Sequence, residues 1–154
     1  MKRGLRAPTL YAMADTLTPR QRSERMARIR STDTKPELAL RKALHAQGLR
    51  YRLRSKLPGR PDLVFPRYKA VVFVHGCFWH RHAGCKVAST PKTNISFWTE
   101  KFERNVSRDQ RVVRELESAG WRVFVAWECE LTGKGRAGEA AAALARGVRG
   151  LASP

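Results

Sequence analysis

The chain has 154 residues, which suffices for one domain with one hydrophobic core, and its hydrophobic fraction of 42% excludes disorder throughout. Lys and Arg number 31 against 13 Asp and Glu, and the formal net charge of +18 favours a polyanionic partner over a generic basic composition. No apolar stretch approaches the roughly 20 residues of a membrane span and no secretion signal is recognisable, so we expect a cytoplasmic protein without a membrane partner.

The first predicted element is a very basic helix. Thr18-Pro19 is typical of a helix start, with the threonine as cap and the proline in the first turn. Met26 and Ile29 then recur at helical spacing within the arginine-rich segment 20–30. The helix is interpreted either as a solvated amphipathic helix or as an arm against DNA phosphates, and its arginine density favours the arm. The arm residues expected at DNA are Met26, Arg25 and Arg28.

The remaining elements alternate between helical and strand patterns. In chain order we expect a helix from Asp33 to Gly48, strands over 51–54, 62–65 and 68–74, a polar loop over 75–85, a helix over 97–118, a strand over 121–127 and an alanine-rich helix over 138–148. This order predicts a mixed α/β fold with a central mixed β-sheet flanked by helices. A flexible tail over 1–18 and one domain over 19–150 complete the predicted organisation.

Hydrophobic spacing predicts which helix faces are buried. On the second helix the expected buried residues are Leu38, Leu40, Ala43 and Leu44. On the long helix the expected inward residues are Phe97, Phe102, Val106, Val113 and Leu116.

The segment from His75 to Cys85 holds three of the four histidines and two of the three cysteines. Zinc prefers four tetrahedral nitrogen and sulfur ligands, and Cys77, His82 and Cys85 supply three of them from one loop. Cys129 follows a later strand that a parallel or mixed sheet would bring alongside. A Cys3His site would use every cysteine and keep no open position, so we expect a structural zinc site. The alternative is buried free thiols with loop histidines.

An acid precedes this loop by one strand. Asp62 begins a predicted strand, where nucleases commonly hold Mg²⁺ through a carboxylate. Pro-Asp alone is mostly a turn dipeptide, so the prediction depends on what lies around it. His75 and His80 remain for phosphate contact or proton transfer, and Glu37 lies on the preceding helix. Asp109 on the long helix is placed to orient a histidine, as carboxylates often do.

Several aromatic residues admit two interpretations. Phe124 and Trp127, on a predicted strand, have an obvious core role. Phe78 and Trp79 lie in a polar loop, where they either wedge between base steps or cap the zinc loop against the core. The residues alone do not choose between these alternatives, and Trp98 raises the same question.

The chain contains the motifs Pro58-Gly-Arg-Pro-Asp62, Val72-Phe-Val-His-Gly-Cys-Phe-Trp-His80, Phe97-Trp98, Asn105-Val106 with Arg108-Asp109, Gly120-Trp-Arg-Val123 and Trp127-Glu-Cys129. Together these motifs resemble the very-short-patch-repair (Vsr) DNA mismatch endonucleases, from about residue 18 to about residue 130. The resemblance implies a core similar to the PD-(D/E)xK nucleases. It also implies Mg²⁺-dependent nicking of duplex DNA 5′ to the thymine of a T:G mismatch, which arises when 5-methylcytosine deaminates.

The resemblance also implies roles for individual residues. Asp62 and the backbone carbonyl of Val74 would hold Mg²⁺, and His75 and His80 would act at the scissile phosphate. Asp109 would pair with His80, and Glu37 would be a further active-site acid. The implied structural zinc ligands are Cys77, His82, Cys85 and Cys129, and the residues implied or expected at DNA are Phe78, Trp79, Trp98, Met26, Arg25, Arg28 and Asn105.

The chain departs from the family pattern at a few points. Val74 stands where threonine is expected, which suits a carbonyl ligand but removes a hydroxyl, and Ala83-Gly84 is an insertion beside the zinc loop. The second acid and lysine of the PD-(D/E)xK superfamily are absent after Asp62, where histidines take over.

Two other functions stay open at this point. One is a restriction-type endonuclease that cuts paired DNA, and the other is a non-catalytic zinc-stabilised DNA-binding module. By resemblance alone, mismatch-repair proteins and a cognate cytosine-5 methyltransferase are functional partners. A monomer suffices to nick one strand.

Overall fold

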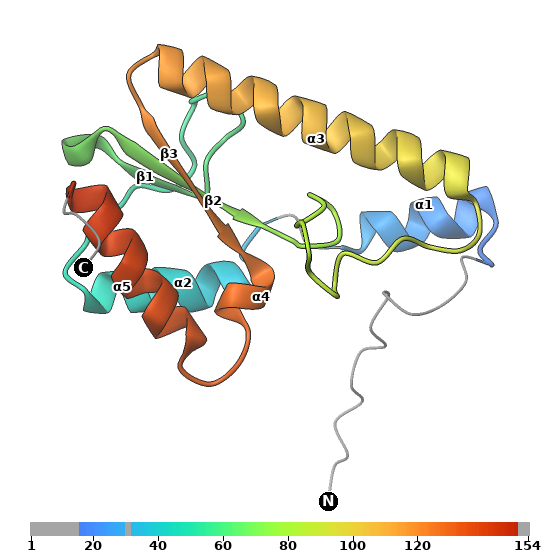
Figure 1. Cartoon of the computed structure of the whole chain (residues 1–154), viewed down its shortest axis with the longest axis horizontal. Helices are drawn as coiled ribbons and strands as arrows, with labels where there is room; N and C mark the ends of the chain where they lie inside the picture. The colour runs from blue at the N-terminus through green and yellow to red at the C-terminus, as the bar shows by residue number, and fades with distance from the viewer. Residues whose placement is uncertain (1–15, 30–31, 151–154) are drawn as a thin grey trace, which may run out of the picture.

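The computed structural model describes residues 16–29 and 32–150. Its elements are α1 (Pro19–Ala27), α2 (Lys35–Ala46), β1 (Leu63–Phe65), the 3-10 helix η1 (Pro66–Tyr68), β2 (Ala70–His75), α3 (Ile95–Ser118), β3 (Arg122–Trp127), α4 (Glu128–Leu131) and α5 (Arg136–Arg149). Figure 1 shows α3 on one side of the sheet, with α2 and α5 on the other. None of the helices in the described ranges is both long and apolar enough to cross a membrane.

Strand β2 is the central strand, between antiparallel β1 and parallel β3. Phe65 pairs with Ala70 at the start of β2, and at the other end of β2 His75 pairs with Trp127. Because β2 and β3 are parallel, their carboxyl ends reach the same edge of the sheet. The segments that follow the two strands therefore begin side by side. The predicted mixed sheet flanked by helices is confirmed.

Both faces of β2 are covered, as its continuous apolar run predicts. Val71 and Phe73 pack with Leu116 of α3 on one face. Ala70 and Val72 belong to a larger cluster on the other face, to which α2 and α5 contribute. The sheet is thus a rigid base for residues at its carboxyl edge.

Local signals place the segments around the site. Thr18 and Gln21 form a capping box, which confirms the predicted start of α1. Gly48 has φ +78° just past the end of α2. Gly59, in the turn that leads to Asp62, has φ +69°, and an ideal Cβ there would lie 2.4 Å from Cγ1 of Val112 on α3. Any other residue would strain the backbone at this φ and push its Cβ into Val112. Gly59 therefore allows the turn to pack closely against α3.

The strand predictions need two corrections. The predicted strand over 51–54 is wrong, because only Arg52 forms an isolated bridge, to Val64, and the segment otherwise has no regular pairing. Residue alternation alone does not make a strand when the rest of the segment lacks a neighbour to pair with. His75 was expected to open the polar loop, but it is the last residue of β2. The pairing of His75 with Trp127 on β3 extends the strand by that residue.

The helix predictions also need correction. On α2, Leu40 and Leu44 are fully buried as expected, but Leu38 is 49% exposed because it lies off their shared face. On α3, Trp98 is buried in place of Phe97, which is 36% exposed. Val106 and Val113 are only half-buried. The short helix α4 was not predicted, and residues 1–15 of the predicted tail lie outside the described residues.

Candidate functional site

The Asp62 carboxylate is anchored to the neighbouring strand. Its Oδ2 accepts a hydrogen bond of 2.7 Å from the backbone N–H of Val74, the residue before His75. Burial raises the pKa of Asp62 to about 6, although this hydrogen bond opposes the shift. The nearby Glu37 carboxylate raises the pKa further, and Arg41 lowers it. A partly buried carboxylate beside a second acid favours a bound cation.

Glu37 lies in the first turn of α2 and is 4% exposed. It accepts hydrogen bonds of 2.8 Å from the backbone N–H of Asp33 and from the Thr34 hydroxyl. Arg41, one turn later, donates to Glu37 at 3.1 Å and to Asp33 at 2.5 Å. Arg41 was not among the residues predicted at the site. Its spacing of four residues from Glu37 on a helix was the available signal for this ion pair.

The two histidines and Asp109 form one cluster. The rings of His75 and His80 stack with centroids 3.9 Å apart and planes at 10°. Nδ1 of His80 lies 2.5 Å from Oδ2 of Asp109, so the carboxylate fixes the ring. Burial and the neighbouring His80 lower the pKa of His75 to about 4. Burial opposes ionisation of Asp109, but the hydrogen bond and the charge of His80 outweigh it and lower the pKa of Asp109.

The predicted zinc ligands also come together. One donor atom from each of Cys77, His82, Cys85 and Cys129 lies within 4.8 Å of the others. Nδ1 of His82 is 3.6 Å from Sγ of Cys77 and 3.4 Å from Sγ of Cys129. Cys77 follows β2 and Cys129 follows β3, so the parallel pairing of the strands unites distant parts of the sequence.

This donor set fits a zinc ion. All three cysteines are free, and burial raises the pKa of Cys77 to about 12. A buried thiolate needs a bound cation, and three sulfurs with one imidazole nitrogen are the ligands that structural zinc takes.

Comparison with known proteins identifies the family. The sequence profile described as DNA mismatch endonuclease Vsr matches residues 14–86. A DNA mismatch endonuclease Vsr from Escherichia coli (strain K12) is 45% identical over 123 residues, which cover 79% of this chain and 78% of that protein. The chain belongs to the Vsr family. It is therefore a DNA endonuclease, a hydrolase of phosphodiester bonds, and the resemblance seen in its motifs is confirmed.

Two further Vsr-like relatives carry the name of nicking enzymes. The type II nicking enzyme V.XorIIP from Xanthomonas oryzae pv. oryzae is 49% identical over 80% of this chain and 90% of its own length. The type II nicking enzyme V.NmeAIP from Neisseria meningitidis serogroup A is 48% identical over 79% of this chain and 87% of its own length.

In this Vsr-family chain the loop aromatics Phe78 and Trp79 cluster with Trp98 and Phe102 of α3, beside α1. Phe78 and Trp98 are 4% and 6% exposed, with ring centroids 5.5 Å apart. Trp79 and Met26 of α1 pack against them. The rings thus form a small cluster separate from the two clusters that cover the sheet, and their insertion into DNA stays a prediction.

The other residues predicted at DNA surround this cluster. Asn105 on α3 donates a hydrogen bond of 3.0 Å to the carbonyl oxygen of Trp79, so in this structure it positions that loop. Arg25 and Arg28 lie exposed at the end of α1, as a phosphate-binding arm requires. Their contact with DNA stays a prediction.

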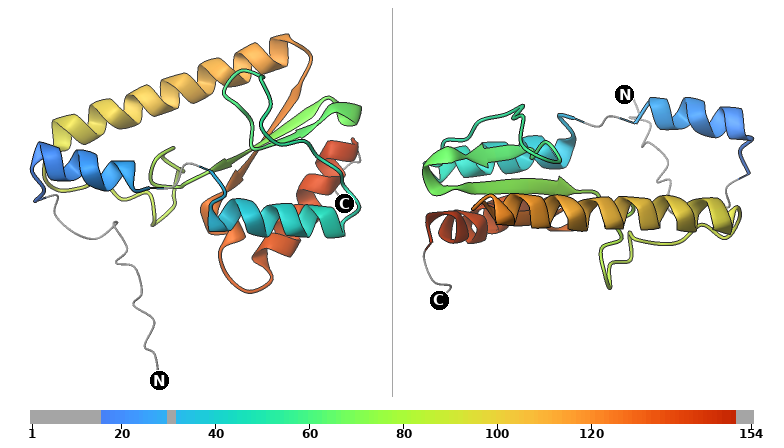
Figure 2. Two further views of the ribbon diagram at one scale, coloured as in Figure 1. Left: turned by 180° about the vertical axis from the view of Figure 1, so that it is seen from behind. Right: turned by 90° about the horizontal axis from the view of Figure 1, so that it is seen from above.

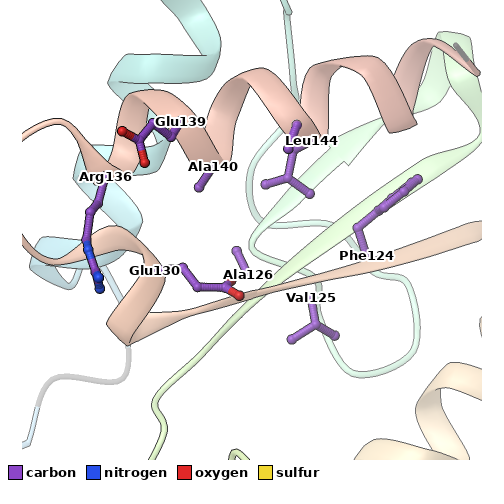
Figure 3. A pocket seen from close by; sticks show the side chains of 9 residues that line it. Phe124, Val125, Ala126, Glu130, Arg136, Glu139, Ala140 and Leu144 are labelled. Carbon is purple, nitrogen blue, oxygen red and sulfur yellow. The ribbon is translucent and has the colours of Figure 1, made fainter. Parts of the chain in front are cut away.

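A groove of about 520 Å³ lies apart from these groups, along β3 between α4 and α5 (Figure 3). Its lining comes from strand residues such as Phe124 and helix residues such as Glu139. None of the predicted catalytic, zinc or DNA-contacting residues lines it. The predicted catalytic residues Asp62, His75 and His80 lie instead at the carboxyl edge of β2.

Proposed function

We propose that the chain is a strand-specific mismatch endonuclease that nicks duplex DNA 5′ to the thymine of a T:G mismatch formed by deamination of 5-methylcytosine. Hydrolysis would leave a 5′ phosphate and a 3′ hydroxyl. One observation carries the proposal. The Asp62 carboxylate is fixed to the backbone of Val74, and the next residue, His75, stacks on the His80–Asp109 pair. The backbone of Val74 and His75 thus links the carboxylate to the two imidazoles at one edge of the sheet.

His80 is the proposed group for proton transfer. With the Nδ1 proton donated to Asp109, Nε2 of His80 is the nitrogen that takes a proton from the attacking water or gives one to the leaving oxygen. Asp109 positions the ring and stabilises its charged form. His75, whose pKa of about 4 keeps it neutral, is proposed to contact the phosphate.

Mg²⁺ is the proposed catalytic cofactor. The carboxylate of Asp62 and the backbone carbonyl of Val74 would supply oxygen ligands, which a hard cation prefers. The raised pKa of Asp62 fits a carboxylate that a cation would keep ionised. When bound, Mg²⁺ stabilises negative charge on the phosphate. Glu37, whose charge acts on Asp62, is proposed as the further acid that would help to retain the cation. The core is proposed to resemble that of the PD-(D/E)xK nucleases, with histidines in place of the usual second acid and lysine.

Zinc at Cys77, His82, Cys85 and Cys129 is proposed to be structural. Four protein ligands leave no open coordination position for water or substrate. The site would tie the loop after β2 to the start of α4 and so hold the histidine loop against the sheet.

Recognition of the mismatch is assigned to the aromatic loop and α1. Side chains of this size unstack base steps at a cost of a few kcal/mol, which is lower at a mismatch. The proposed DNA contacts are Phe78, Trp79, Trp98, Met26, Arg25, Arg28 and Asn105. A monomer is sufficient for a single nick. We also propose a functional link to a cytosine-5 methyltransferase and to mismatch-repair proteins.

Strand-specific nicking tests the proposal. We expect the protein with Mg²⁺ to cut only the thymine strand of a T:G duplex and to leave the matched T:A duplex intact. Asp62→Asn should slow single-turnover nicking by about 10³-fold or more, because it removes a charged oxygen ligand. Glu139→Gln, the same acid-to-amide change in the groove of Figure 3, should nick at the unaltered rate.

Three results would count against the proposal. Nicking by Asp62→Asn at the wild-type rate would remove the catalytic assignment. Equal cleavage of both strands of the paired duplex would favour a restriction-type enzyme. Tight DNA binding with no cleavage under any divalent ion would favour the binding module.

A further inference from the structure

The Trp127 ring lies between the zinc ligands and the reaction site. It stacks on the ring of His82, with centroids 4.2 Å apart and planes at 3°. It also meets the ring of His75 edge to face, at 5.4 Å and 74°. One side chain, which the sequence assigned to the core, therefore contacts both a zinc ligand and an active-site imidazole.

The backbone explains this placement. Trp127 is the last residue of β3 and pairs in parallel register with His75, the last residue of β2. Cys129, two residues later, belongs to the Cys/His cluster. The strand end that carries Trp127 is therefore held on one side by the sheet and on the other by the metal ligands.

His75 needs such a support because the backbone fixes only its Cα–Cβ direction. An imidazole at a strand end keeps two rotatable bonds, and its ring orientation is set by what packs around it. Three rings do so here. His80 stacks on it at 3.9 Å, Phe73 lies 5.8 Å away, and Trp127 lies 5.4 Å away. His80 is itself held by Asp109, whereas Trp127 is the ring that joins His75 to the zinc ligand His82.

We propose that Trp127 is a positioning residue that fixes the ring orientation of His75. Because Trp127 also stacks on His82, a bound zinc ion that immobilises His82 would also limit the motion of the His75 ring. Zinc held by the Cys/His cluster would fix His82, whose Nδ1 lies nearest the sulfurs of Cys77 and Cys129. His82 presents its ring face to Trp127, and Trp127 limits the orientation of the His75 ring. The zinc centre then contributes to turnover as well as to folding. The kinetic part rests on the proposed function, whereas the placement of His75 does not.

Substitutions of Trp127 with and without an aromatic ring test this. Trp127→Leu should retain one zinc per chain and bind the T:G duplex within threefold of wild type, yet nick at least tenfold more slowly at saturating enzyme. Trp127→Phe should restore the rate to within threefold. Trp121→Leu makes the same change just before β3, where the ring packs on the α3 face with Lys69, and should leave the nicking rate unaltered.

A direct readout separates positioning from general damage. The nuclear Overhauser effect between ring protons of His75 and His80 reports their stacking, and we expect it in wild type, Trp127→Phe and Trp121→Leu. It should be weak or absent in Trp127→Leu. Should that variant not fold, Trp127→Met fills the space with a flexible chain and should give the same results.

The outcomes discriminate between the two proposals. The role of Trp127 would be overturned if Trp127→Leu or Trp127→Met nicked at the wild-type rate and kept the nuclear Overhauser effect between His75 and His80. A rate loss that only parallels a loss of zinc would also overturn it. Absence of nicking by the wild type would instead overturn the proposed function, and the Overhauser measurements would still decide the placement of His75.

Discussion

The two ends of α3 border regions that are built in different ways. Near the sheet, specific hydrogen bonds fix the proposed reaction groups, as between Asp62 and Val74 and between His80 and Asp109. At the far end, α1 lies along the first turns of α3, beyond the sheet (Figures 1 and 2). There Met26 contributes apolar packing, and Arg22 stacks on Phe97 at 4.9 Å.

This difference suits the two tasks that we assign to the regions. Proton transfer needs groups held within a fraction of an ångström, which strand register and charged hydrogen bonds provide. Recognition of a distorted duplex needs side chains that can repack, which a small apolar cluster under a short helix allows. Substitutions near the sheet should therefore alter the rate of nicking, and those at α1 should alter DNA binding.

Loss of a zinc ligand should have the largest effect on the region near the sheet. We expect Cys129→Ser to lose zinc, lower the free energy of unfolding by several kcal/mol and abolish nicking, because a structural zinc site contributes folding energy directly. The zinc content per chain and the free energy of denaturant unfolding, both measured at one fixed zinc concentration, would test these expectations.

The groove supplies a control for the zinc variant. Ala140→Ser, which replaces a half-buried groove residue with a small polar one, should retain zinc and nearly all of the stability. Full zinc content and unaltered stability in Cys129→Ser would remove this cysteine from the ligand set.

Asp109→Asn should have the next largest effect. The amide keeps the shape but no longer stabilises a charged His80, so we expect single-turnover nicking to fall about 10²- to 10⁴-fold with little change in affinity for the T:G duplex. Glu100→Gln, on the exposed side of α3, is the matched control and should be neutral. A change in affinity as large as the change in rate would place Asp109 among the DNA contacts rather than the reaction groups.

Sequence patterns predicted the elements with strong periodicity or caps. Thr18-Pro19 marked the start of α1, and the apolar run over β2 marked the central strand. The prediction of a strand over 51–54 was wrong because the alternation of residues does not reveal whether a partner strand exists. Phe97 was predicted to be buried, whereas its neighbour Trp98 is the buried residue. Adjacent residues on a helix differ by only about 100° in direction, so the packing partner decides which of the two is buried.

The site was predictable where residue types carry specific chemistry. The four Cys and His ligands and the pairing of His80 with Asp109 follow from ligand chemistry and from the family resemblance. The roles of Arg41 and Trp127 were not predicted. Arginine and tryptophan are common in ordinary ion pairs and cores, and only the fold shows that one lies beside two acids and the other between two imidazoles.

The arginines of α1 should show the smallest effect, confined to binding. Arg25→Gln with Arg28→Gln removes two exposed charges from the proposed arm. We expect weaker binding of T:G and paired duplexes alike, and the slope of log Kd against log salt concentration should fall by about 2. The nicking rate at saturating enzyme should be unaltered. Arg67→Gln with Lys42→Gln, two exposed positions on η1 and α2, removes the same charge elsewhere. If both double variants lower the salt dependence equally, the arginines act through net charge alone and α1 has no specific place on DNA.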